Sequence, residues 1–427
     1  MTPDPRTRRG RLRGILLDVE PLRRDRDYRL LWIGQLVSGG GRQVTVVALP
    51  FQLYVLTGST LAVGLLALVQ LVPILAFALG GGAIADAVDR RRLLLATQLG
   101  LAAASTAFFW LALTPGTPVW TYYAVAFVAA GLGAVDQPAR TSAIPRLVPV
   151  ARLPAAIALN QLGFQAMAVA GPALGGVLIA TIGVAAAFFV DAVTFGAAIL
   201  ALLVIAPIPP HPDAARPSLG TVAVGLRFVR GRRVVLSTFV IDLVAMVFGM
   251  PTSLFPALAL GVFAAGPAGV GLMVAAPAAG ALVGAALSGW VGRLVHPGRA
   301  VIGAVAVWGV AITAFGLSTF SFALALAFLA VAGAADVFSA VLRSAIVQLD
   351  TPDALRGRVA SIHILVVTSG PRLGDAEAAA VAAVVGPQLS VVSGGILCLV
   401  GLAGVVRRYP ELRRYVSPAL RAPEPVP

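Results

Sequence analysis

The sequence predicts an all-α integral membrane protein with twelve transmembrane helices in two six-helix halves. Three observations predict this: the composition is too apolar for a water-soluble chain, apolar windows recur at bilayer length, and arginines occur in alternate connections. Of the 427 residues, 59% are hydrophobic and 12% charged, against about 25% charged in an average soluble domain. The mean hydropathy is +0.92. A lipid bilayer accepts such a surface, because it is as apolar as the side chains that it contacts.

The spans follow from the length of the apolar windows. A helix needs about 20 mostly apolar residues to cross the hydrocarbon core. Windows on that scale predict spans at 30–56, 60–85, 93–113, 119–140, 154–180, 184–206, 234–262, 267–291, 300–317, 321–342, 359–382 and 388–406.

The connections between the spans fall into two sets. One set carries arginine in every member and includes both termini with 86–92, 141–153, 207–233, 292–299 and 343–358. The other set carries no basic residue: 57–59, 114–118, 181–183, 263–266, 318–320 and 383–387. This is the positive-inside pattern. It predicts an even number of spans, both termini in the cytoplasm and a place in the cell inner (plasma) membrane. The first 29 residues are polar and lack the apolar core of a cleavable signal peptide.

The strongly basic balance does not indicate nucleic acid. The net charge is +14 and the sequence contains arginine but no lysine. Apart from Arg42 and Arg372, the arginines are predicted at the termini, in alternate connections or at adjoining helix ends. The missing lysine argues against a Walker A loop, and the single Cys398 against a disulfide or a CxxC site. The three histidines have no metal-ligand spacing, so no metal, cofactor or catalytic group is expected.

The central connection divides the chain. We expect a cytoplasmic segment at 1–29, an N-terminal half at 30–206, a cytoplasmic loop at 207–233, a C-terminal half at 234–406 and a cytoplasmic tail at 407–427. The halves resemble each other at an offset of 202 residues, where Gly131, Ala143, Ile144, Leu147 and Leu153 correspond to Gly333, Ala345, Ile346, Leu349 and Leu355. Paired repeats of this kind occur in transporters that bind substrate near the midplane.

The connection after the second span carries a recognisable motif. It reads Gly-Ala-Ile-Ala-Asp-Ala-Val-Asp-Arg-Arg-Arg from Gly82 to Arg92, and resembles the GxxxDxxxRR loop of the major facilitator superfamily. Gly82 permits close helix approach, Asp86 suits a helix N-terminus, and Asp89 with Arg90 and Arg91 is expected to form ion pairs. A solvated loop that obeys the positive-inside pattern is the alternative.

The fifth span contains Gly171-Pro172-Ala173-Leu174-Gly175-Gly176. This segment resembles the GPxxGG motif of exporters in the same superfamily. Small residues allow tight helix packing and proline allows a bend. A plain packing motif is the alternative interpretation of Gly171, Pro172, Gly175 and Gly176.

Three further segments are similar to the enterobactin-exporter-like branch, which includes siderophore and macrolide exporters. They are 136–141, 355–359 and 370–375, and the resemblance covers about residues 25–410. It implies a major facilitator fold, alternating access, a cavity lined by spans one, four, seven and ten, and proton-coupled efflux of an amphipathic drug, siderophore or other metabolite. It also suggests a cytoplasmic gate comprising Gly82, Asp86, Asp89, Arg90, Arg91, Asp136, Arg140, Arg356 and Arg358. The fourth span lacks the mid-membrane Arg-Gly of drug/proton antiporters, and Arg140 lies near its cytoplasmic end instead.

Ionisable residues inside spans are the candidates for coupling or substrate binding, because each costs about 2.5–3.5 kcal/mol to insert. They are Arg42, Asp191, Asp242, Asp336, Arg372, Asp375 and Glu377. Arg372 and Asp375 share a helix face and can neutralise each other. Asp375 or Glu377 is our candidate for proton coupling, with an ion pair for packing or an outer-mouth charge as the alternative. Arg42 either attracts an anionic substrate or pairs with an acid across the halves. Amides that can bond substrate or join helices are Gln35, Gln52, Gln70, Asn160, Gln161 and Gln165.

Two other functions share these global features. A facilitative or proton-symport importer differs only in the direction of flux, and a membrane sensor or scaffold binds ligand without flux. An intramembrane enzyme would need a nucleophile, a base or a metal set that the spans do not supply. A monomer is expected, because two six-helix halves already enclose one cavity.

Overall fold

The computed structural model describes residues 18–209, 219–289 and 294–417, and within them no side chain of 78–87, 219–223 or Ala354 is described. These residues form helices and connections, with no strand among them. The N-terminal half comprises α3 (Arg26–Thr57), α4 (Thr60–Ala87), α5 (Arg90–Leu113), α6 (Val119–Leu147), α7 (Leu153–Thr181) and α8 (Val184–Val204). The C-terminal half comprises α10 (Arg233–Gly249), η2 (Thr252–Leu254), α11 (Phe255–Ala257), η3 (Leu258–Val262), α12 (Gly266–Ala286), α13 (Pro297–Leu317), α14 (Phe322–Asp350), α15 (Arg356–Val385) and α16 (Pro387–Arg408).

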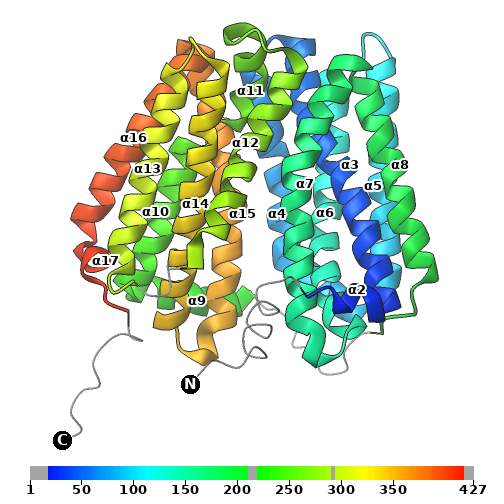
Figure 1. Cartoon of the computed structure of the whole chain (residues 1–427), viewed down its shortest axis with the longest axis horizontal. Coiled ribbons are helices and arrows are strands. Elements are labelled where there is room, and N and C mark those ends of the chain that lie inside the picture. The colour runs from blue at the N-terminus through cyan, green and yellow to red at the C-terminus, as the bar shows by residue number, and fades with distance from the viewer. Residues whose placement is uncertain (1–17, 210–218, 290–293, 418–427) are drawn as a thin grey trace, which may run out of the picture.

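Short elements lie at one end of this bundle. They are α2 (Glu20–Arg24), η1 (Val150–Arg152), α9 (Leu219–Gly231), η5 (Asp353–Leu355) and α17 (Pro410–Arg414). Figure 1 shows α2, α9 and α17 at the bottom, where the arginine-bearing connections run. We call this end the arginine-rich end and the opposite one the arginine-free end. The stretch 207–233 was expected to be a loop, but it contains the helix α9.

Ten helices in the described part of the chain are long and apolar enough to cross a membrane. Two further helices, α3 and α15, are 32 and 30 residues long, but they carry Arg42, Arg372, Asp375 and Glu377. The all-α membrane fold predicted from the sequence is confirmed, while apolar composition accounts for ten of the twelve predicted spans.

At the arginine-rich end, two helices extend well beyond their predicted ends. The helix α6 continues to Leu147 and α14 to Asp350, seven or eight residues beyond the predicted ends at 140 and 342. Hydropathy windows stop where charged residues begin, whereas backbone hydrogen bonds continue the helix into the polar region.

The predicted seventh span, 234–262, is not one continuous helix. The helix α10 ends at Gly249, and the chain proceeds through η2 and α11 to the π-helix η3. Pro251 follows Met250, which has φ −120° and ψ 81°. Proline lacks a backbone N–H and disfavours the helical conformation in the preceding residue, so the break occurs where Pro251 enters the span.

The two halves meet at the arginine-free end. The helix α7 packs against α12, and α4 packs against α15. Thr60, at the start of α4, donates a hydrogen bond of 3.4 Å to the carbonyl of Ala379 on α15. At the arginine-rich end, Figure 1 shows the ribbons of the two halves further apart.

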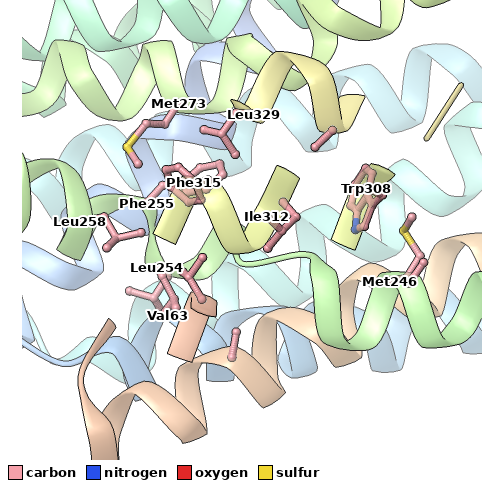
Figure 2. Close-up of a cluster of buried hydrophobic side chains, with 14 of the residues drawn as sticks. Val63, Met246, Leu254, Phe255, Leu258, Met273, Trp308, Ile312, Phe315 and Leu329 are labelled. Carbon is pink, nitrogen blue, oxygen red and sulfur yellow. The ribbon is translucent and has the colours of Figure 1, made fainter. Parts of the chain in front are cut away.

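A buried apolar cluster surrounds the broken seventh span (Figure 2). The rings of Phe255 and Phe315 are 6.2 Å apart at 87°, an edge-to-face arrangement that aromatic quadrupoles favour. The cluster also contains Val63 of α4, so it joins both halves. Dispersion contacts in this core hold the short elements η2, α11 and η3 in place without a continuous helix.

Candidate functional site

A pocket opens in the wall of the N-terminal half. It is lined by Trp32, Gln35, Leu36, Ser38, Gly39, Arg42, Gln43, Asp136, Gln137, Arg140, Asn160, Gly163, Phe164 and Met167. These residues come from the first two-thirds of α3, the end of α6 and the start of α7, all in the part of the bundle toward the arginine-rich end. Of the four spans expected to line the cavity, the first and fourth line this pocket and the seventh and tenth do not, whereas α7, the fifth span, lines it without having been expected.

Helix periodicity explains which side chains of α3 reach the pocket. Gln35, Gly39 and Arg42 are spaced i, i+4 and i+7, so they lie on one helix face. A Cβ added to Gly39 would meet nothing within 4 Å. The glycine therefore leaves open space beside the Arg42 side chain.

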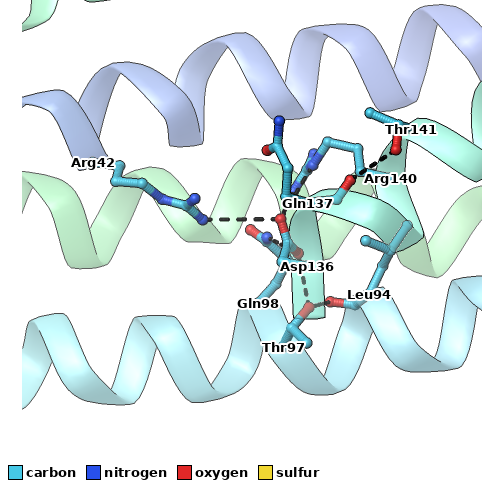
Figure 3. A network of polar contacts seen from close by, with 8 residues as sticks. All are labelled: Arg42, Leu94, Thr97, Gln98, Asp136, Gln137, Arg140 and Thr141. Carbon is cyan, nitrogen blue, oxygen red and sulfur yellow. Dashed lines mark hydrogen bonds and ion pairs between the residues drawn. The ribbon is translucent and has the colours of Figure 1, made fainter. Parts of the chain in front are cut away.

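Asp136 on α6 is the centre of a polar network in the N-terminal half (Figure 3). Its carboxylate accepts hydrogen bonds from Thr97 at 2.8 Å and Gln98 at 2.7 Å. It also pairs at 3.0 Å with Arg140, which lies one turn further along the same helix. Charge-assisted bonds of this kind compensate a buried carboxylate.

Arg42 on α3 lies further from the Asp136 carboxylate than the other members of this network. Its nearest guanidinium nitrogen lies 3.9 Å from Asp136 Oδ2, on the side away from Arg140 in Figure 3. The Arg42 side chain is 38% exposed, and its Nε is buried without a hydrogen-bond partner. With two guanidinium groups and one carboxylate, the cluster carries a net charge of +1. The acid nearest to Arg42 belongs to the same half, not to the opposite one.

A second charged cluster lies in the C-terminal half. Arg343 on α14 donates a hydrogen bond to Asp242 on α10, and its second nitrogen lies 3.9 Å from Asp336. The side chains of Arg343 and Asp242 are buried, whereas that of Asp336 is 36% exposed. This cluster has two carboxylates and one guanidinium, for a net charge of −1.

Arg343 is a site residue that the sequence analysis missed, because the predicted tenth span ended at 342. Arg140, in the corresponding helix of the N-terminal half, could have indicated Arg343. Arg140 and Arg343 each lie seven residues before the end of a 29-residue helix, α6 and α14. Measured from the helix ends, the two arginines lie at equivalent positions in the two halves, although the 202-residue offset aligns Arg140 with Leu342. Each belongs to a charged cluster, and the two clusters have opposite net charge.

The charged residues on α15 do not form the pair expected from their spacing. Arg372 donates instead to Gln70 of α4, across the two halves. Asp375 accepts from the Thr252 hydroxyl and from the Ser253 backbone N–H, the latter at 2.7 Å. Because η2 follows the break in the seventh span, its hydroxyl and N–H point at Asp375 rather than into a helix. Glu377 is half-buried, and within the described residues its side chain has no ion pair.

Asp191 lies away from the pocket, inside the N-terminal half. It accepts hydrogen bonds from Thr45 at 2.6 Å and Ser105 at 2.7 Å, which joins α8 to α3 and α5. The structure therefore gives Asp191 helix-joining contacts rather than a place among the pocket residues.

The residues expected at the cytoplasmic gate of the N-terminal half bond to three separate helices of that half. Asp89 caps α5 by accepting from the Arg92 N–H at 3.0 Å. Arg91 donates to the carbonyls of Leu202 and Leu203, both at 2.7 Å, and Arg90 to Ser142 at 2.9 Å. The two bonds from Arg91 hold the end of α8, a helix terminus that attracts cations. The side chains of Gly82 and Asp86 lie outside the described residues.

Of the gate arginines of the C-terminal half, Arg356 is exposed and Arg358 is half-buried. Arg356 pairs with Asp353 at 3.0 Å, with both side chains well exposed. The carbonyl of Arg358 lies 3.0 Å from where a Cβ at Gly225 of α9 would stand. These contacts join α15 to neighbours in its own half and to α9.

The glycines of the GPxxGG segment face other helices. A Cβ at Gly175 would lie 3.1 Å from the Cα of Val44 on α3, and one at Gly171 would meet the Gly40 carbonyl at 3.2 Å. Gly176 instead faces α12 of the other half. The packing role of the motif is therefore visible, with Pro172 inside a helix that continues to Thr181.

A family model described as "Transmembrane secretion effector" matches residues 18–426. The chain belongs to this family. Among curated proteins it is similar to the enterobactin exporter EntS of Citrobacter koseri, with 29% identity over 96% of this chain and 97% of that one. It is also similar to the enterobactin exporter EntS of Escherichia coli, with 26% identity over 94% and 96%.

Solved structures share the fold of this transmembrane secretion effector. The nucleoside transporter NupG superimposes with a TM-score of 0.73 at 12% identity, covering 90% of this chain and all of that one. A bacterial homologue of the lysosomal transporter Spinster, solved in an inward-facing conformation, gives 0.68 at 16% identity over 94% and 99%. The fold is that of the major facilitator transporters. The chain is a multi-pass membrane transporter with a small-molecule substrate, not an enzyme.

Proposed function

We propose that this chain exports an amphipathic, siderophore-like small molecule in exchange for protons. The observation that carries the proposal is the pocket around Arg42, in a chain similar along almost its whole length to two named enterobactin exporters. An open pocket with amide, guanidinium and aromatic side chains suits an amphipathic molecule with several oxygen atoms.

Export by alternating access requires the two halves to rock against each other, so that a pocket on the N-terminal half opens first to one side of the membrane and then to the other. The halves pack together at the arginine-free end, while the pocket lies toward the arginine-rich end. By the positive-inside rule, the arginine-rich end with both termini faces the cytoplasm of the plasma membrane. The structure then corresponds to the state that receives substrate from inside. The pocket around Arg42 is formed by helices of a single chain, so we expect the monomer to be the working unit.

Proton coupling needs a carboxylate that gains and loses a proton between the two states. Asp336 on α14 fits this need, because it is the exposed member of a cluster with one negative charge in excess. Two charged groups of the cluster accompany Asp336: Asp242 of α10 and Arg343 of α14. The histidine on α15, His363, packs against Phe239 of α10 with ring centroids 5.9 Å apart. Protonation of Asp336 makes the cluster neutral and leaves Arg343 paired with Asp242.

The acids favoured from the sequence are less suited to this role. Asp375 already accepts from two donors of η2, so its carboxylate holds the break in the seventh span. Glu377 remains the competing candidate, since its carboxylate is half-buried and without an ion pair in the described residues.

Everted membrane vesicles test the function. A fluorescent amphipathic dye should accumulate inside them when a proton gradient is applied, and accumulation should stop when the gradient is collapsed. Gradient-dependent movement in the opposite direction would indicate an importer. Binding of the dye by folded protein without any flux would indicate a sensor or scaffold.

A further inference from the structure

The guanidinium of Arg42 has unused hydrogen-bonding capacity. Its only ion-pair partner in the described part of the chain is Asp136, at 3.9 Å. That carboxylate already accepts bonds from Thr97, Gln98 and Arg140. Because Asp136 is compensated by closer donors, most of the positive charge of Arg42 remains available to another anion.

Four side-chain amides surround Arg42 in the same pocket: Gln35, Gln43, Gln137 and Asn160. None of the four makes a hydrogen bond from its side chain within the described residues, in contrast to Gln98 and Gln52, which do. Polar side chains at membrane depth normally pair with protein groups or line a wet cavity. The amides therefore face a space that must hold water or a polar ligand.

Aromatic side chains complete the wall. The Trp32 indole N–H donates to the Leu159 carbonyl at 3.0 Å, which fixes the ring beside the pocket. Phe164 on α7 is 53% exposed. An aromatic or aliphatic ring of a ligand can pack on these side chains, while its polar end reaches the guanidinium.

We propose that Arg42 binds an anionic oxygen group of the substrate, a carboxylate or a deprotonated phenol on an amphipathic molecule. The four amides bond the other oxygens of the ligand, and Trp32 and Phe164 contact its apolar part. A guanidinium binds paired oxygens bidentately. The net charge of +1 on the cluster disfavours a cation at the same place. This inference names the substrate class of the exporter and rests on the proposed function.

Three pyrene probes test the charge preference: pyrenebutyric acid, its methyl ester and pyrenebutylamine. They share one ring system and differ in charge, so affinity differences report the polar group. Binding to purified protein in lipid nanodiscs is followed by pyrene fluorescence without any gradient. The wild type should bind the acid about tenfold to a hundredfold more tightly than the ester, as expected for a charge-assisted bond.

Arg42→Gln should remove the preference for the acid, so that acid and ester bind with similar affinity. Arg42→Lys should retain part of it, because the charge remains but the planar fork is lost. Arg414→Gln, which removes an exposed charge outside the pocket, is the matched control and should bind like the wild type. Equal affinity of the wild type for acid and ester, an unchanged preference in Arg42→Gln, or no binding of any probe by the folded wild type would overturn the inference.

Transport of the same probes separates this inference from the function on which it rests. If everted vesicles accumulate ester and acid equally in both the wild type and Arg42→Gln, export stands and the anion site fails. If the wild type binds the acid selectively but accumulates no probe, the anion site stands and export of this class fails.

Discussion

Gly176 of α7 and Gly271 of α12 face each other across the two halves, so close that a Cβ built on Gly176 would lie 2.9 Å from the Gly271 Cα. That is closer than two carbon atoms can approach without a shift. The helices can therefore meet only because neither position has a side chain. Since this contact lies at the arginine-free end, it is part of the closure that alternating access must open.

A leucine at Gly176 should prevent that closure. Overpacking of this kind costs about 1–3 kcal/mol, which lowers the closed population by about five- to 150-fold. The experiment uses a Cys398→Ser background, which removes the single, buried cysteine of the sequence. A reporter cysteine is then placed on α15 by Ala376→Cys. It should react faster with a membrane-impermeant maleimide when Gly176→Leu is present than when it is absent. Gly196→Leu is the control, because a Cβ there meets nothing within 4 Å. Unchanged labelling in Gly176→Leu would show that the contact does not limit opening.

The bond between Arg372 and Gln70 should contribute less to the same closure. Side-chain hydrogen bonds between membrane helices average about 0.6 kcal/mol, roughly threefold in population. Arg372→Gln and Gln70→Ala should each raise labelling of Ala376→Cys by that order, and the double variant should add little to either single change. Gln52→Ala, which breaks the bond to Tyr122 inside one half, should leave labelling unchanged. Additive effects of the two changes would mean that Arg372 and Gln70 do not act on closure through their mutual bond.

The sequence predicted the helical membrane fold because hydropathy and arginine placement act over whole spans. It indicated Arg42 as one of the ionisable residues inside spans and Asp136 with Arg140 as residues of a cytoplasmic gate, and the structure brings both arginines to the Asp136 carboxylate. Spacing along one helix was a poor guide on α15, where Arg372 bonds Gln70 of another helix instead of Asp375. Contacts between helices depend on their relative rotation, which a single sequence does not specify.

Arg343 illustrates a different error. A hydropathy window ends at the first charge and assigns it to the polar connection, whereas α14 continues for seven residues beyond Arg343. The buried position of Arg343 is stable because Asp242 on α10 pairs with it. A charge whose partner is 101 residues away in sequence is recognised only when both helices are in place.

Removing one member of that buried pair should destabilise the protein. Arg343→Gln leaves Asp242 buried and uncompensated, a loss of about 3–5 kcal/mol for a broken buried pair. The double variant Arg343→Gln, Asp242→Asn should recover much of it, because both charges are gone. Arg356→Gln is the matched control, since its pair with Asp353 is exposed and is worth about 0–1 kcal/mol. Thermal unfolding of the purified proteins in one detergent measures all three. A double variant no more stable than Arg343→Gln would contradict the pairing.

Asp336→Asn should uncouple transport from the proton gradient. It makes the cluster with Asp242 and Arg343 permanently neutral, the state that protonation of Asp336 would produce. We expect gradient-driven accumulation in everted vesicles to fall by about tenfold or more, the effect of a coupling free energy near 1.4 kcal/mol, while exchange of labelled for unlabelled dye without a gradient persists. Asp191→Asn is the control, because that acid bonds Thr45 and Ser105 away from the pocket and should not alter the gradient dependence. Full gradient-driven accumulation in Asp336→Asn, together with its loss in Glu377→Gln, would place the coupling acid on α15 instead of α14.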